Sequence, residues 1–178
     1  MPEKHLPQDP YIQAVTDALT AAGLPPTDHS WTDRCESLGT YRYLNAVITV
    51  DPSNTHDLDY DDVPADVEWP HGLLLLWEWH TGVEAVHGEP DRGPAWQFAE
   101  LKRDGSNEYP TGLPVHGYAS PDAIVDAARK VIAREIRPTS FDGGPSTWRG
   151  EVIGGSWERA DELAAACDAW AVKETAER

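Results

Sequence analysis

The segment 73–80, LLLLWEWH, constrains the fold of this chain more than any other part of the sequence. It is short and mostly apolar. Pro70 and Gly72 precede it, and Thr81 and Gly82 follow it. A short apolar run bounded by turn-forming residues is typical of a buried β-strand. We therefore expect this segment to be the central strand of a sheet.

Alternation of side chains along a strand gives this segment two different faces. The first face is apolar throughout and contains Leu73, Leu75, Trp77 and Trp79. The second face begins with Leu74 and Leu76 and ends with Glu78 and His80. At this polar end, buried structure meets titratable groups, although the residues match no strong catalytic or cofactor motif.

A large excess of acidic residues narrows the classes of partner. The 178 residues include 31 Asp and Glu against 14 Lys and Arg, which gives a formal net charge of −17. Such a charge repels nucleic-acid phosphates and anionic membranes, and it favours protein partners with a basic surface. We therefore expect a protein partner, no direct nucleic-acid binding and no membrane association.

The cysteines and the N-terminus indicate a cytoplasmic protein. Cys35 and Cys167 lack CxxC spacing and metal-binding neighbours, so we expect both to be reduced thiols. The N-terminal residues lack the apolar core of a signal peptide, and no stretch reaches the roughly 18 apolar residues of a membrane span. No pattern indicates a cofactor.

Three segments with helical spacing of apolar residues predict helices. The first begins at Asp9, which can act as a cap, and ends at Gly23. The second begins at Ser120 and ends before Pro138, and the third begins at Ser156.

Strands are predicted on both sides of the central segment. Segments 41–50, 83–87 and 95–101 are rich in β-branched or aromatic residues, and 83–87 is expected to pair back on the central strand. The composition of segments 24–39 and 102–119 is that of loops.

This order of elements indicates an α+β fold. We expect an antiparallel meander of three to five strands, covered on one face by an N-terminal helix and one or two C-terminal helices. The chain then divides into a flexible tail (1–8), a single α+β domain (9–137), a Gly/Pro-rich connector (138–155) and a C-terminal helix (156–178). That helix either packs on the domain or binds a partner.

Four short segments together resemble small uncharacterised α+β proteins of high-GC actinobacteria. They are PY at 10–11, AAGLP at 21–25, WEWHTG at 77–82 and SP at 120–121. The resemblance covers residues 9–136. Because those proteins carry no assigned activity, it implies a fold and a habitat but no mechanism.

One acidic segment has the spacing of a calcium-binding loop. Its carboxylates fall at the first, third, fifth and twelfth places of an EF-hand loop: Asp57, Asp59, Asp61 and Glu68. However, Asp62 stands where that loop requires glycine, and Pro64 stiffens the part that presents a backbone carbonyl. We therefore favour a solvated acidic loop over a calcium site.

A second candidate site lies at the polar end of the central strand. Glu78 and His80 share a strand face, and His87 follows them closely in the sequence. Imidazole and carboxylate groups suit zinc, and a carboxylate bonded to a histidine makes it a stronger base. The spacing matches no zinc signature, so we favour a structural role and keep a metal or acid–base site as the alternative.

The tryptophans divide into core positions and candidate interface positions. Those expected in the core are Trp77, Trp79, Trp96 and Trp157. Trp31, Trp69 and Trp148 lie in predicted loops among acidic residues and prolines, and Trp170 lies on the predicted C-terminal helix. Exposed aromatic residues with polar surroundings are typical of protein interfaces, so these four are predicted to bind a partner. The alternative is that they fill the ends of the sheet.

These observations favour a small acidic protein-interaction module without catalytic activity. It would engage its partner through the sheet face or the C-terminal helix. Two alternatives remain open. One is a metal-dependent hydrolase centred on Glu78, His80 and His87, and the other is an acidic nucleic-acid mimic that inhibits a DNA-binding protein.

Overall fold

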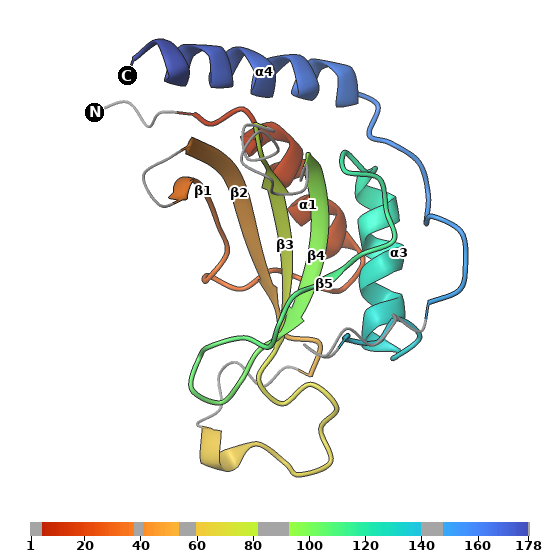
Figure 1. The fold of residues 1–178 in the computed structure, drawn as a ribbon. Coiled ribbons are helices and arrows are strands. Elements are labelled where there is room, and N and C mark those ends of the chain that lie inside the picture. Colours follow the sequence, from red (N-terminus) through yellow and green to blue (C-terminus); the bar gives the residue numbers. More distant parts are fainter. Residues whose placement is uncertain (1–4, 38–40, 54–59, 82–92, 140–147, 178) are drawn as a thin grey trace.

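The computed structural model describes residues 5–37, 41–53, 60–81, 93–139 and 148–177, which form an antiparallel sheet packed against helices (Figure 1). The strands are β1 (Trp31–Ser37), β2 (Tyr41–Val50), β3 (Leu73–Trp79), β4 (Pro94–Glu100) and β5 (Thr111–Gly112). The helices are α1 (Asp9–Ala21), α3 (Pro121–Ile132) and α4 (Ala160–Ala176), with a short 3₁₀ turn, η1 (Tyr60–Asp62). The predicted α+β class is confirmed.

The strands follow one another across the sheet in chain order. β3 is the central strand, as predicted, and pairs with β2 on one side and β4 on the other along its whole length. Leu75, for example, lies opposite both Ile48 and Phe98. The predicted strand at 83–87 lies outside the described residues.

One face of the sheet forms the hydrophobic core together with α1 and α3. The tryptophans predicted for the core all pack there, Trp157 with part of its surface exposed. Within the core, the hydroxyl of Tyr11 donates a hydrogen bond to the carbonyl of Ala119 at 2.6 Å and accepts one from Nε1 of Trp96 at 3.0 Å. Because each polar group has a partner, its burial in an apolar environment is tolerated.

The edge strand β1 was not predicted. Trp31–Ser37 falls in the segment expected to be a loop, yet it pairs with β2, with Arg34 opposite Leu44. Its sequence, WTDRCES, shows no apolar alternation because an edge strand has one neighbour and a largely exposed surface. The two-residue β5 likewise falls in a segment expected to be a loop.

Two helix-boundary signals act as predicted, whereas other boundaries are shifted: α3 ends at Ile132, earlier than the predicted end before Pro138. Ser120 caps α3, its side chain accepting a hydrogen bond from the backbone N of Ala123 at 3.2 Å. Gly23 follows α1 with a φ of +81°, a conformation that glycine adopts without strain. Asp9 was predicted to be the cap of α1, but Gln8 occupies that position and Asp9 is the first helical residue.

α4 packs on the domain and does not extend away from it. It begins at Ala160, later than the predicted start, and crosses the end of the sheet where β2 begins and β3 ends (Figure 1). Its buried residues are Leu163, Cys167 and Glu174. Trp170 lies on the same stripe and packs edge-on against Trp79, with ring centroids 6.4 Å apart. Of the two alternatives left open for this helix, the structure supports packing.

Candidate functional site

Glu78 and His80 are in contact, as strand alternation suggests. Oε2 of Glu78 lies 3.0 Å from Nε2 of His80. The imidazole stacks on the ring of Tyr43, with a centroid separation of 4.6 Å and an interplanar angle of 8°. Because His80 is only 5% exposed, little of its ring is open to a substrate, and the geometry suits a structural role better than acid–base catalysis. His87 lies outside the described residues.

Cys35 joins this cluster from β1. It lies opposite Tyr43 in the sheet, and the two side chains are hydrogen-bonded. Burial raises the pKa of the Cys35 thiol. Burial, followed by the neighbouring thiol, raises the pKa of Tyr43 to about 12. Both groups are therefore protonated at neutral pH, and a protonated thiol is a poor nucleophile.

The described carboxylates of the candidate calcium loop are engaged elsewhere or point to solvent. Asp61 forms an ion pair with Arg103, and Glu68 is exposed. Asp57 and Asp59 lie outside the described residues. Among the residues that the structure describes, no three His, Cys, Asp or Glu side chains converge as a metal site.

Trp69 is a buried residue, so the prediction that it lies exposed at an interface is wrong. It is 1% exposed, and its Nε1 donates a hydrogen bond to the carbonyl of Ile132 at 3.2 Å. The guanidinium of Arg134 lies 3.9 Å from its ring centroid. Trp69 thus ties the segment before β3 to the end of α3. Its acidic and proline neighbours in the sequence suggested exposure, but the residues that bury it come from α3 and the turn after it.

Trp148 is half-buried and packs against the core. Its Nε1 donates a hydrogen bond to the carbonyl of Glu151 at 3.2 Å, and Nζ of Lys130 lies 5.1 Å from the centre of its ring. Part of the ring is therefore used in holding the segment after residue 147 against α3.

Trp170 and Trp31 lie on the walls of two adjoining depressions beside the start of α1. The first depression, of about 760 Å³, lies between residues 5–13 and α4, and Trp170 is part of its wall. The second, of about 630 Å³, lies between α1 and β1, and Trp31, which is 52% exposed, is part of its wall. The residues common to both are His5, Leu6, Asp9 and Gln13. We call the combined depression the α1 groove.

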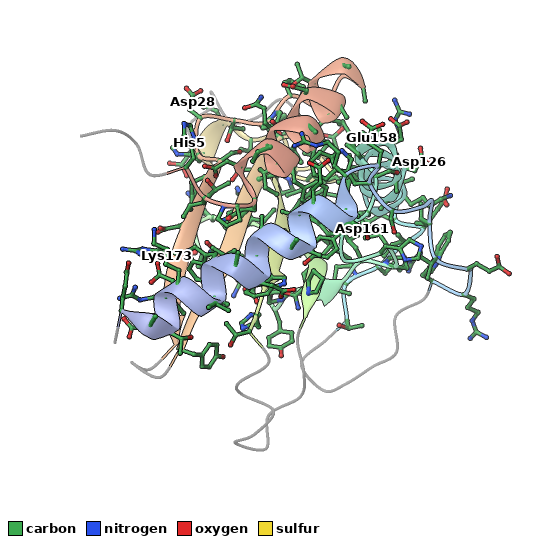
Figure 2. The ribbon with its side chains drawn as sticks, turned by 90° about the horizontal axis from the view of Figure 1, so that it is seen from above. His5, Asp28, Asp126, Glu158, Asp161 and Lys173 are labelled. Carbon is green, nitrogen blue, oxygen red and sulfur yellow. The ribbon has the colours of Figure 1, made fainter. Side chains whose placement is uncertain are left out.

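The two walls of the first depression come from opposite ends of the chain. Figure 2, seen from above, shows His5 beside the start of α1 and Lys173 on α4, and both residues line this depression. The α1 groove therefore exists only when the chain is completely folded, which is why sequence patterns did not reveal it.

Gln8 fixes the start of α1 beside the groove. Its side chain is fully buried, and its Nε2 donates hydrogen bonds to the carbonyls of Asp33 and Asn45, each at 3.1 Å. Leu6 also packs against the core. Residues 6–8 therefore belong to the domain, although the sequence placed them in a tail. A single buried glutamine carries no periodic signal that could have identified it.

Both signs of charge line the α1 groove. The carboxylate of Asp9 is held in place because it accepts hydrogen bonds from Oγ1 of Thr32 and from the backbone N of Leu6, each at 2.7 Å. The other charged groups on its walls are Asp33, Glu174, Lys173 and Arg34. A bound segment would therefore meet fixed carboxylates and tryptophan rings together.

Glu174 is a residue of this site that sequence reasoning missed. It is 5% exposed, and its carboxylate contacts Nη1 of Arg34 at 3.0 Å and Nη1 of Arg42. One signal was available, because Glu174 follows Trp170 and Cys167 at helical spacing on the same stripe of α4. That spacing predicts a buried acid but not its partners, which precede it by 140 and 132 positions.

Comparison of the chain with protein-family models, with characterised proteins and with solved structures found no match. None of the described helices has the length and hydropathy needed to cross a bilayer. Cys35 and Cys167 are both free thiols. The geometry and charge of the described residues are therefore the basis for assigning a function.

Proposed function

We propose that this protein is a small acidic, non-catalytic binding module that engages a protein partner through the α1 groove. The observation that carries the proposal is the position of Trp31 and Trp170 on the walls of two adjoining depressions. A segment lying along the groove contacts both rings. Tryptophan suits this role because it buries a large apolar area while keeping a polar group at its edge.

The charge of the chain supports a partner with a basic surface. A net charge of −17 accelerates association with a positively charged protein and disfavours acidic competitors. Within the groove, Asp9 and Asp33 offer carboxylates to a cationic side chain. The two free thiols fit a reducing compartment, so we place the interaction in the cytoplasm.

Affinity capture with matched aromatic variants tests this proposal. The immobilised full chain, its Trp31→Ala and Trp170→Ala variants and a Tyr109→Ala control are each incubated with lysate of the organism that encodes the protein. Tyr109 is 61% exposed but lines neither depression, so it matches Trp31 in exposure and differs in position. We expect at least one basic protein to bind wild type and the Tyr109→Ala control. The captured protein should bind each tryptophan variant about thirtyfold more weakly than wild type, which is the usual effect of truncating a hot-spot tryptophan.

Two outcomes would contradict the proposal. One is capture of the same proteins by the tryptophan variants and the control, and the other is capture of nothing by wild type. The same experiment tests the alternative that this protein is an acidic mimic of nucleic acid, an alternative suggested by its net charge. If the captured protein binds nucleic acid and added DNA displaces it from the immobilised chain, the mimic is favoured.

A further inference from the structure

α4 is attached to the rest of the domain unequally along its length. At its N-terminal side, backbone hydrogen bonds fix the approach to the helix: Trp157 N donates to Tyr118 O at 2.7 Å, and Ser120 N donates to Gly155 O at 2.8 Å. Further along, Leu163 and Cys167 are buried in the core. The first half of α4 is therefore held by ordinary packing.

The last turns of α4 depend on Glu174. Within residues 172–177, Glu174 is the one buried residue. Its carboxylate lies between Arg34 on β1 and Arg42 on β2, and these contacts join the helix to the edge of the sheet. Two guanidinium groups around one carboxylate supply the hydrogen bonds that a buried carboxylate requires.

The same residues build the α1 groove. Glu174, Lys173 and Trp170 form the α4 wall of the first depression, and Arg34 lines the second. Because Glu174 contacts Arg34, the ion cluster joins the wall of the first depression to that of the second. If the last turns of α4 leave the sheet, the first depression loses Lys173 and Glu174 from that wall, while Trp170 stays packed on Trp79.

We propose that Glu174 is the positioning residue of the α1 groove, and that docking of the last turns of α4 and binding of a partner stabilise each other. The inference rests on the proposed function only for its second half, the coupling to a partner. The physical reason for coupling is that a partner spanning the first depression meets Lys173 and Glu174 beside Trp170 only when the last turns are docked, so it shifts the equilibrium toward docking.

The use of ion pairs makes this wall sensitive to salt. Arg34 and Arg42 keep part of their surfaces in solvent, where dissolved ions screen charge. With an apolar residue at position 174, the last turns of α4 would dock without this dependence on salt. The groove is therefore expected to open as ionic strength rises, while the packed half of α4 stays in place.

Hydrogen exchange of the full-length protein tests docking without any partner. Glu174→Gln is compared with Glu177→Gln, a matched control at an exposed position just after the last turn of α4. We expect exchange at residues 172–177 to rise by at least about tenfold in Glu174→Gln, because a buried ion contact is broken, and to stay unchanged in Glu177→Gln. Exchange in α1 and α3 reports whether the variant remains folded. Equal exchange at 172–177 in the two variants would overturn the inference.

Wild type provides a second measurement that requires no variant to fold. Raising sodium chloride from roughly 0.05 to 1 M should speed exchange at 172–177 and leave α1 and α3 unchanged. Exchange at 172–177 that is independent of salt would overturn the inference, whatever the behaviour of Glu174→Gln.

The coupling is tested by repeating the affinity capture with both glutamate variants. We expect Glu174→Gln to lose the proteins that Trp170→Ala loses and Glu177→Gln to retain them. Fast exchange with undiminished capture by Glu174→Gln would overturn the coupling. Trp31→Ala, which changes β1 and not α4, decides the proposed function separately, so the two ideas can fail independently.

Discussion

Glu174 and His80 are equally hidden from solvent, at 5% exposed each, but the fold satisfies them in different ways. His80 contacts Glu78, two positions earlier, and stacks on Tyr43 of the adjacent strand β2. Glu174 depends on arginines that precede it by 140 and 132 positions. One cluster is assembled by neighbouring strands, and the other requires the two ends of the chain to meet.

This difference determines how much of the free energy of unfolding is lost when one contact of each cluster is removed. The imidazole of His80 is held by stacking on Tyr43, whereas a carboxylate between two guanidinium groups must keep its charged partners. The cluster around Glu174 should therefore be sensitive to loss of a single member. The cluster around His80 should depend more on ring packing than on charge.

The largest expected effect is that of Arg42→Met. This variant leaves Glu174 with one of its two guanidinium partners, and breaking a buried ion contact costs about 3 to 5 kcal/mol. Since the Arg42 side chain is 32% exposed, we discount this to about 2 kcal/mol of the free energy of unfolding. Urea unfolding at neutral pH measures it.

A triple variant serves as the control for Arg42→Met. Replacing Arg34 and Arg42 by Met and Glu174 by Leu removes every charge of the cluster, so most of the lost stability should return. If Arg42→Met is as stable as wild type, the contact contributes nothing and the contrast with His80 disappears.

The next largest effect is expected for His80→Ala, which removes the ring that stacks on Tyr43. Loss of an aromatic contact and of buried surface should cost about 1.5 kcal/mol of the free energy of unfolding. His80→Phe keeps a ring there and loses the contact with Glu78, so it should cost less than half as much. Equal losses in urea unfolding for the two variants would show that the polar contact, and not packing, stabilises this cluster.

The contrast also explains which parts of the structure could be predicted from the sequence. The contact between Glu78 and His80 follows from alternation along one strand, and the buried face of β3 follows from the same pattern. Ser120 caps the start of α3 and Gly23 ends α1, as these local signals predicted. Each of these inferences uses residues only a few positions apart.

The parts that could not be predicted depend on residues distant in the sequence. β1 is polar because it lies at an edge, so it carries no strand pattern of its own. Trp69 lies among acids and prolines in the sequence, but Arg134 and Ile132 cover it in the fold. The α1 groove brings residues 5–13 against α4, and no local pattern encodes that meeting.

A smaller effect is expected for Glu78→Gln. The Glu78 side chain is 37% exposed, so its carboxylate is partly hydrated whether or not it meets His80, and an amide can still bond to the imidazole. We expect a change below about 0.5 kcal/mol in the free energy of unfolding. A loss as large as that of Arg42→Met would place the two clusters in the same class and contradict the distinction drawn between them.

The smallest effect at neutral pH concerns Cys167, which shares the buried stripe of α4 with Glu174. Burial raises the pKa of the Cys167 thiol from an ordinary value of 9.0 to about 12. Well below pH 9.0 the thiol is protonated in both folded and unfolded chains and adds no pH dependence. From there to about pH 12 the unfolded chain loses the proton while the folded chain keeps it, so stability falls as pH rises.

Urea unfolding of wild type and Cys167→Ala at several pH values isolates this contribution. The difference in the free energy of unfolding between the two proteins should be constant between about pH 6 and pH 8, and wild type should lose stability relative to the variant above about pH 9. A constant difference up to about pH 10 would show that the thiol ionises as readily in the folded protein as in water. The stripe of α4 would then be open to solvent at Cys167. In the folded protein, this stripe excludes solvent by packing at Cys167 and by paired charges at Glu174.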